Sequence, residues 1–153
     1  SNVKEDVVDE LVIMDDLLVN EYRLSKDFSR RLSYALAFCD GTATQKVQNA
    51  MEFIESCTSK WNRRIGYIYY VLHAVVANLS IPLDTIQKDY DDVMEYLKKS
   101  RQYGWFSKPE RSLHACMILL SYYVGNNTSI YTLTNAILYT IALMRALAQR
   151  SSR

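Results

Sequence analysis

The sequence predicts an all-α fold. The chain holds only four Gly and two Pro in 153 residues, so few positions favour a turn and the segments between turns are long. Apolar residues recur every three or four positions in most of these segments, which is the spacing of amphipathic helices. We therefore predict a single all-helical domain over residues 1–153, with about seven helices and no strand.

The first helix is expected at about residues 4–20, where apolar residues alternate with acids at helical spacing. Ser25 is a candidate N-cap for a second helix that ends near Cys39, with Gly41 just beyond it. These two helices open the predicted domain.

The third helix has Thr42 or Thr44 as its candidate cap, because either threonine directly precedes an apolar stripe at helical spacing. A fourth helix is expected at about residues 62–79 and ends before Pro82, since proline cannot continue a helix.

The fifth helix, at about residues 83–99, has the clearest apolar stripe, which is narrow and predicts an outer position. The sixth helix is expected to begin at Ser107, because Pro109 in the first turn and Glu110 three residues after the serine complete a capping-box pattern. Gly125 is expected to end it.

A seventh helix is expected at about residues 128–149, and the last six helices form three predicted helical hairpins. Segments 29–38, 62–71 and 110–119 each contain arginine before an apolar stretch, although their unequal spacing leaves chance similarity open. The architecture is then a compact helical bundle or a short α–α repeat stack, with the acidic first helix at one end.

Charge alternates along the chain. Four successive blocks, residues 1–21, 22–64, 65–97 and 98–153, carry net charges of −6, +4, −4 and +7, although the whole chain is only +1. This pattern favours internal charge pairing or self-association over a uniformly basic surface for nucleic acid.

The three cysteines, Cys39, Cys57 and Cys116, have no CxxC spacing and lie among apolar residues. We expect buried free thiols in a reducing compartment, and the absence of a secretory signal at the start of the sequence favours the cytoplasm.

Residues 130–148 are apolar enough to raise the question of a membrane span, with Arg145 as the only charge. The polar residues among them favour a core helix, or a helix shared with a partner chain, so we expect no membrane partner. The predicted dimer surface consists of Tyr131, Leu138, Ala142 and Arg145.

His114 and Cys116 lie in an apolar run, but residues two apart on a helix point about 200° apart, so they cannot form one site. Glu110 shares a face with His114 and can orient its ring. We expect His114 and His73 to be structural, and we expect no zinc or di-iron centre and no cofactor.

Two pairs of carboxylates are candidate magnesium ligands, Glu52 with Glu55 and Asp92 with Glu95. These pairs resemble the acidic helices of all-helical nucleotide pyrophosphohydrolases of the MazG kind, which implies magnesium-dependent phosphate hydrolysis. The resemblance is confined to the pairs, so we assign no family. The alternative interpretation is that the four carboxylates belong to solvated helix faces.

The segment 98–111 combines cations with aromatic residues. Its predicted partner-binding residues are Lys98, Lys99, Arg101, Tyr103, Trp105, Lys108 and Arg111. Cations beside aromatic rings can grip phosphates or stack on bases, and the following helix offers an N-terminus to an anion. The alternative is that the aromatic residues staple the helix start to the core.

The leading hypothesis is a non-catalytic helical domain that binds another protein, including a second copy of itself as a homodimer. The first alternative is a magnesium-dependent phosphohydrolase that uses the four carboxylates. The second alternative is binding of nucleic acid or phosphate through residues 98–111.

Overall fold

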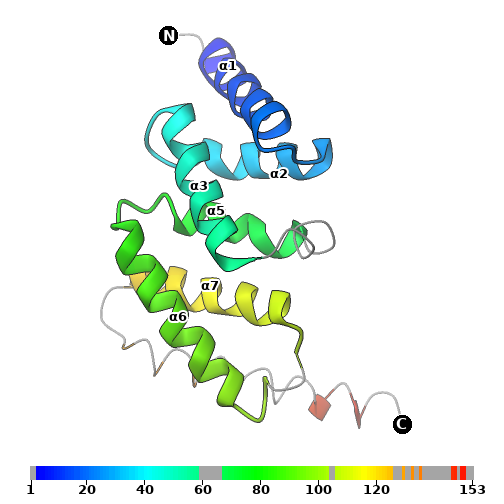
Figure 1. Cartoon of the computed structure of the whole chain (residues 1–153), viewed down its shortest axis with the longest axis vertical. Coiled ribbons are helices and arrows are strands. Elements are labelled where there is room, and N and C mark those ends of the chain that lie inside the picture. Colours follow the sequence, from blue (N-terminus) through cyan, green and yellow to red (C-terminus); the bar gives the residue numbers. More distant parts are fainter. Residues whose placement is uncertain are drawn as a thin grey trace. The chain divides into compact units, whose positions relative to one another are not determined.

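The structure, a computed structural model, describes residues 3–58, 67–103 and 106–125, together with the single positions 129, 132, 135, 146, 147, 149 and 150. The all-α prediction is confirmed, because the described residues form helices and turns and none of them lies in a strand (Figure 1). The chain divides into two compact units, residues 1–87 and 88–153. The predicted helix at 128–149 lies largely outside the described residues.

Besides the first turn of α6 (Leu83–Lys99), the described residues of unit 1 form four α-helices and two short irregular helices. They are α1 (Val3–Asp16), the π-helix η1 (Leu17–Glu21), α2 (Lys26–Ala37), α3 (Ala43–Cys57), the 3₁₀-helix η2 (Tyr67–Tyr70) and α5 (Val71–Val76). The main contacts of α2 are with α1 and α5, and those of α3 are with α5 and α1. The four helices therefore share one core, rather than α2 and α3 pairing as a separate hairpin.

The predicted N-caps of α2 and α3 are confirmed. Ser25 Oγ accepts a hydrogen bond from the N–H of Phe28 at 3.3 Å and caps α2. Thr42 and Gln45 form a reciprocal capping box at the start of α3, with distances of 3.2 and 3.4 Å. Between the two helices Gly41 has a φ of 117°, a conformation that favours glycine.

The core of unit 1 consists of apolar side chains from all four α-helices. Its buried members are Met14, Leu18, Phe28, Leu32, Leu36, Val47, Ala50, Met51, Ile54, Tyr70 and Ala74. Within α2 and α3 these residues are three or four positions apart, so one face of each helix points inward. The periodicity that predicts these helices therefore also predicts which face is buried.

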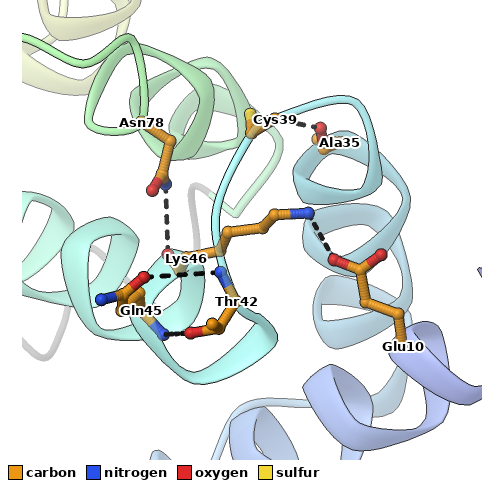
Figure 2. Close-up of polar contacts among 7 residues, drawn as sticks. All are labelled: Glu10, Ala35, Cys39, Thr42, Gln45, Lys46 and Asn78. Atoms are coloured by element: carbon orange, nitrogen blue, oxygen red, sulfur yellow. Dashed lines mark hydrogen bonds and ion pairs between the residues drawn. The ribbon is translucent and has the colours of Figure 1, made fainter.

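A buried lysine links three of these helices (Figure 2). Lys46 on α3 is only 3% exposed, and its Nζ binds the carboxylate of Glu10 on α1. Its backbone carbonyl accepts a hydrogen bond from Asn78 Nδ2 at 3.1 Å, just beyond α5. Because a buried ammonium without a counter-charge is costly, this ion pair restricts how α1 lies on α3.

Asn78 also ends α5. Its Nδ2 donates to the carbonyl of Ala74 at 2.9 Å, which satisfies a terminal carbonyl of the helix. The fourth helix was predicted over residues 62–79, whereas α5 covers Val71–Val76 and is preceded by η2. Residues 59–66 lie outside the described part of the chain.

Two buried serines on α2 have different surroundings. Ser29 donates its hydroxyl hydrogen to Asp15 Oδ1 on α1 at 2.5 Å. Ser33, four residues later, is 3% exposed, and within the described residues its Oγ has no hydrogen-bond partner. One serine therefore joins two helices, while the other is buried with its hydrogen-bonding capacity unused.

Unit 2 contains most of α6 (Leu83–Lys99) and all of α7 (Lys108–Gly125), at the predicted bounds. Tyr90 Oη and Ser112 Oγ lie 2.6 Å apart, and Tyr123 donates to Asp89 Oδ2 at 2.6 Å, so both bonds join α6 to α7. Burial and the Asp89 carboxylate raise the pKa of Tyr123, which keeps its hydroxyl protonated as a donor.

The two serines predict opposite changes in stability. Ser33→Ala removes an unpaired buried hydroxyl and is expected to leave the free energy of unfolding unchanged or raise it by up to about 1 kcal/mol. Ser29→Ala removes the bond to Asp15 and is expected to lower it by about 1 kcal/mol. Urea denaturation of both variants measures the difference, and equal losses would contradict the assignment of the two hydroxyls.

The buried ion pair predicts that stability falls strongly when Lys46 loses its partner Glu10. Glu10→Gln leaves the ammonium buried beside a neutral group and is expected to lower the free energy of unfolding by about 2 to 3 kcal/mol. The double variant Lys46→Met with Glu10→Gln is expected to recover most of that loss.

The matched control is Glu95→Gln, which breaks the exposed pair with Lys99. It is expected to change stability little, because water screens such pairs. The role of Lys46 would be refuted if Glu10→Gln and Glu95→Gln had the same effect in urea denaturation.

Candidate functional site

A basic groove lies along the last turns of α6 and the first turns of α7. Its volume is about 610 Å³. The lining side chains are mostly cationic: Met94, Glu95, Lys98, Lys99, Lys108 and Arg111. Four of the seven residues predicted to bind a partner therefore surround one groove, while Arg101 is exposed but does not line it.

Local sequence signals place these cations. Leu97 is fully buried, so Lys98 and Lys99 beside it on α6 are left on the exposed side. The chain then turns and restarts at α7, where Lys108 and Arg111 are three residues apart and share a face. The groove thus combines the end of one helix with the start of the next.

Positive charge dominates the groove. Glu95 and Lys99 form an exposed ion pair at 2.9 Å, and the hydrogen bond and charge of Lys99 lower the pKa of Glu95. In the part of the chain that the structure describes, Lys98 and Lys108 have no ion pair. Their charges are therefore available to an anion from outside.

The side chain of Arg111 is held in place by a hydrogen bond to the backbone. Its Nη1 donates to the carbonyl of Phe106 at 3.1 Å, while its Nε is buried and has no hydrogen-bond partner among the described residues. The guanidinium keeps further N–H groups for a ligand, since it carries five donors. A fixed arginine loses less side-chain entropy on binding than a free one.

The N-terminus of α7 contributes less to anion binding than the sequence predicts. Ser107 Oγ accepts from the N–H of Glu110 at 3.4 Å and donates to Glu110 Oε1 at 3.0 Å. Pro109 has no N–H, so most donors of the first turn are used or missing. The carboxylate of Glu110 also lies there. Recognition of an anion therefore depends on the side-chain cations.

The aromatic residues of the loop support the groove from inside. Tyr103 is fully buried, with its ring 5.1 Å from those of both Phe106 and His114. Tyr103 was predicted to contact a partner, but its burial makes it a staple between the loop and α7. Trp105, predicted for the same role, lies outside the described residues.

His114 belongs to this aromatic cluster. Its ring is half-buried against Tyr103 and Phe106, and burial lowers its pKa, with Glu110 opposing the shift. The imidazole is therefore neutral at pH 7. All three cysteines are free thiols, as predicted; Cys57 and Cys116 are buried, whereas Cys39 was also expected to be buried and is only partly so.

His73 lies in the core of unit 1. It has no exposed surface and its ring packs 5.0 Å from Tyr70 and 5.6 Å from Phe53. Burial lowers its pKa from 6.5 to about 3, although a backbone hydrogen bond to Tyr69 opposes the shift. His73 is therefore a neutral core residue at physiological pH.

The predicted magnesium ligands lie on exposed helix faces. Glu52 and Glu55 are exposed on α3, and Asp92 and Glu95 are exposed on α6. Glu95 is engaged by Lys99. Among the residues described, no three His, Cys, Asp or Glu side chains are grouped so that they could hold a metal ion.

The predicted dimer surface, Tyr131, Leu138, Ala142 and Arg145, lies outside the described residues. The same holds for most of residues 130–148, which raised the question of a membrane span. Within the described parts of the chain, none of the helices combines the length and apolar character needed to cross a bilayer.

Comparison with known proteins found no family model, no curated protein and no solved structure that matches this chain. The functional interpretation therefore depends on the geometry of the chain itself.

His73 predicts a loss of stability in mild acid. Its pKa in the folded state is below its unfolded value, so the unfolded chain binds the proton first as the pH falls. The contribution of the neutral ring is complete above about pH 6.5 and declines towards pH 3, with about 2 kcal/mol lost at pH 5. Urea denaturation at several pH values measures this slope.

The control for this slope is His73→Leu, which removes the titrating group. The variant is expected to show a smaller decline in the free energy of unfolding between pH 7 and pH 5. An unchanged decline would assign the acid sensitivity to other groups.

Proposed function

We propose that this chain is a non-catalytic helical interaction domain that binds an acidic segment of a partner protein in the basic groove. The observation that carries the proposal is the convergence of Lys98, Lys108 and Arg111 on one groove, in which Glu95, the acidic residue among the described lining residues, is already paired with Lys99. Three uncompensated cations at close range favour a ligand with several negative charges.

The shape of the site favours a peptide segment over a single small ion. A volume of about 610 Å³ exceeds what one carboxylate or phosphate fills. Met94 adds an apolar contact, and methionine adapts to different side chains. An acidic segment with an apolar residue matches both features.

Nucleic acid is the weaker candidate for the same groove. Single-stranded binding relies on exposed aromatic faces that stack on bases. In the described part of the loop, Tyr103 is buried and Phe106 is partly covered by the Tyr103 and His114 rings. The groove is therefore distinguished mainly by its positive charges and not by exposed aromatic rings.

Self-association belongs to the same proposal. Residues 1–21 carry a net charge of −6 and are one acidic segment that a second copy can offer. Sedimentation of the protein alone, at low and high salt, tests whether the acidic partner is another copy of the chain.

The proposal predicts salt-dependent binding of an acidic peptide. The probe is a fluorescein-labelled peptide of alternating Glu and Leu, measured by anisotropy against the full chain. Affinity is expected to fall as salt rises from about 0.05 to about 0.3 M. Lys98→Glu with Lys108→Glu is expected to weaken binding at least about tenfold, because two attractions become repulsions.

The matched control is Lys88→Glu, which makes the same charge change at an exposed position of α6 that does not line the groove. It is expected to leave the affinity within about twofold. Equal losses of affinity in both variants would mean that only net charge matters, and would refute the proposed site. Tighter binding of a single-stranded oligonucleotide of similar charge would favour the nucleic-acid alternative.

A further inference from the structure

A second groove, different in character, lies between α1 and α2 in unit 1. Its volume is about 300 Å³. Apolar side chains supply much of its lining, which consists of Val8, Leu11, Val12, Asp15, Arg30, Ser33 and Tyr34. The basic groove of unit 2 and this groove share no residue, so they are separate candidate surfaces.

The apolar residues of this groove are unusually exposed. Val8, Val12 and Tyr34 are 47%, 61% and 64% exposed. On α1 the lining residues fall at spacings of three and four, so they form one continuous stripe on the helix. A contiguous apolar stripe next to a groove marks an interaction surface more often than scattered exposed residues do.

One residue that lines the groove has a buried polar atom. Ser33 is 97% buried, since only 3% of it is exposed, and its hydroxyl has no hydrogen-bond partner in the described part of the structure. Buried hydroxyls in native proteins are nearly always paired. An occupant of the groove that offers a donor or acceptor would give the Ser33 hydroxyl a hydrogen-bond partner.

Acidic residues border the same stripe. Glu5, Asp9 and Asp16 are all exposed. Glu5 lies three residues before Val8, and Asp16 lies four residues after Val12, which places these acids along one edge of the stripe. The α1 edge therefore favours an occupant with positive charge on the side that faces α1, whereas Arg30 lines the α2 side of the groove.

This charge pattern argues against a symmetric contact between two copies. An isologous dimer in which the two α1 helices pack on each other would bring the acids of one α1 close to those of the other. Like charges opposite one another are destabilising. The acids also repel an anionic lipid surface.

We propose that the α1–α2 groove is a docking site for a basic amphipathic helix of a partner protein. The apolar face of that helix covers Val8, Val12 and Tyr34, its lysines or arginines face Glu5, Asp9 and Asp16, and one polar side chain reaches Ser33. This is the helix-in-groove mode, in which anchors at three- and four-residue spacing fill the groove.

The probe for this site is a synthetic amphipathic peptide of about 18 residues, long enough for five helical turns. It carries a Leu stripe bordered by Lys, and a second peptide has Glu in place of every Lys. Anisotropy with the full chain is expected to show binding of the Lys peptide and at least about tenfold weaker binding of the Glu peptide.

Adjacent residues of α1 supply a matched pair of variants. Val12→Ser alters the groove, whereas Ile13→Ser alters a 50% exposed residue that does not line it. Val12→Ser is expected to weaken binding of the Lys peptide at least about fivefold, and Ile13→Ser by less than about twofold. Both positions are at least half exposed, so thermal unfolding of both variants is expected to match the parent chain.

A double variant separates this proposal from the basic groove. Lys98→Glu with Lys108→Glu is expected to leave binding of the Lys peptide unchanged, even where it abolishes binding of an acidic peptide. Equal weakening by Val12→Ser and Ile13→Ser, or equal binding of the Lys and Glu peptides, would overturn the proposal. Self-association that Val12→Ser abolishes would also overturn it, because the occupant would then be a second copy.

Discussion

The buried ammonium of Lys46 is the constraint on which the arrangement of unit 1 depends. Lys46 lies one residue after the capping box that starts α3. Its ammonium binds Glu10 on α1, and its backbone carbonyl accepts a hydrogen bond from Asn78 at the end of α5. Apolar packing alone tolerates sliding and rotation of helices, because the hydrophobic effect is not directional. A buried charge tolerates neither, because it must keep its partner.

This constraint has a consequence for the surface. Glu10 and Val12 are two residues apart on α1, so their side chains point about 200° apart. When Glu10 turns toward α3, Val12 and Val8 are left on the outer side beside α2. The exposed apolar stripe is therefore a result of how the ion pair orients α1, and the acids at its edge are exposed for the same reason.

Unit 2 shows the same relation between a hidden anchor and an exposed set of charges. Tyr103 packs against Phe106 and His114 and fixes the loop between α6 and α7. The carbonyl of Phe106 accepts a hydrogen bond from Arg111, so the groove has one pre-positioned cation. Each unit thus presents one candidate binding surface, basic in unit 2 and apolar with an acidic border in unit 1. Opposite character suits them to different partners.

The sequence by itself determined α1, α2, α3, α6 and α7, and the caps that start α2, α3 and α7. Ser25, Thr42 and Ser107 act within three residues along the chain, and apolar periodicity identifies the buried faces of α2 and α3, so local signals were sufficient there. On α1 the apolar spacing includes Val8 and Val12, which are exposed. The sequence also identified the cluster of cations that lines the basic groove.

Only the tertiary structure decided which chemically interesting side chains face solvent. Tyr103 was predicted to contact a partner and is buried, and Lys46, for which no role was predicted, is also buried. Among the described residues the hydroxyl of Ser33 has no hydrogen-bond partner, and no sequence pattern predicted this, because Ser29 on the same helix is also buried but is bonded. The burial of a side chain and its hydrogen-bond or ion-pair partner depend on residues that are distant in the sequence, as Glu10 is from Lys46. Periodicity over a few helical turns does not predict such contacts.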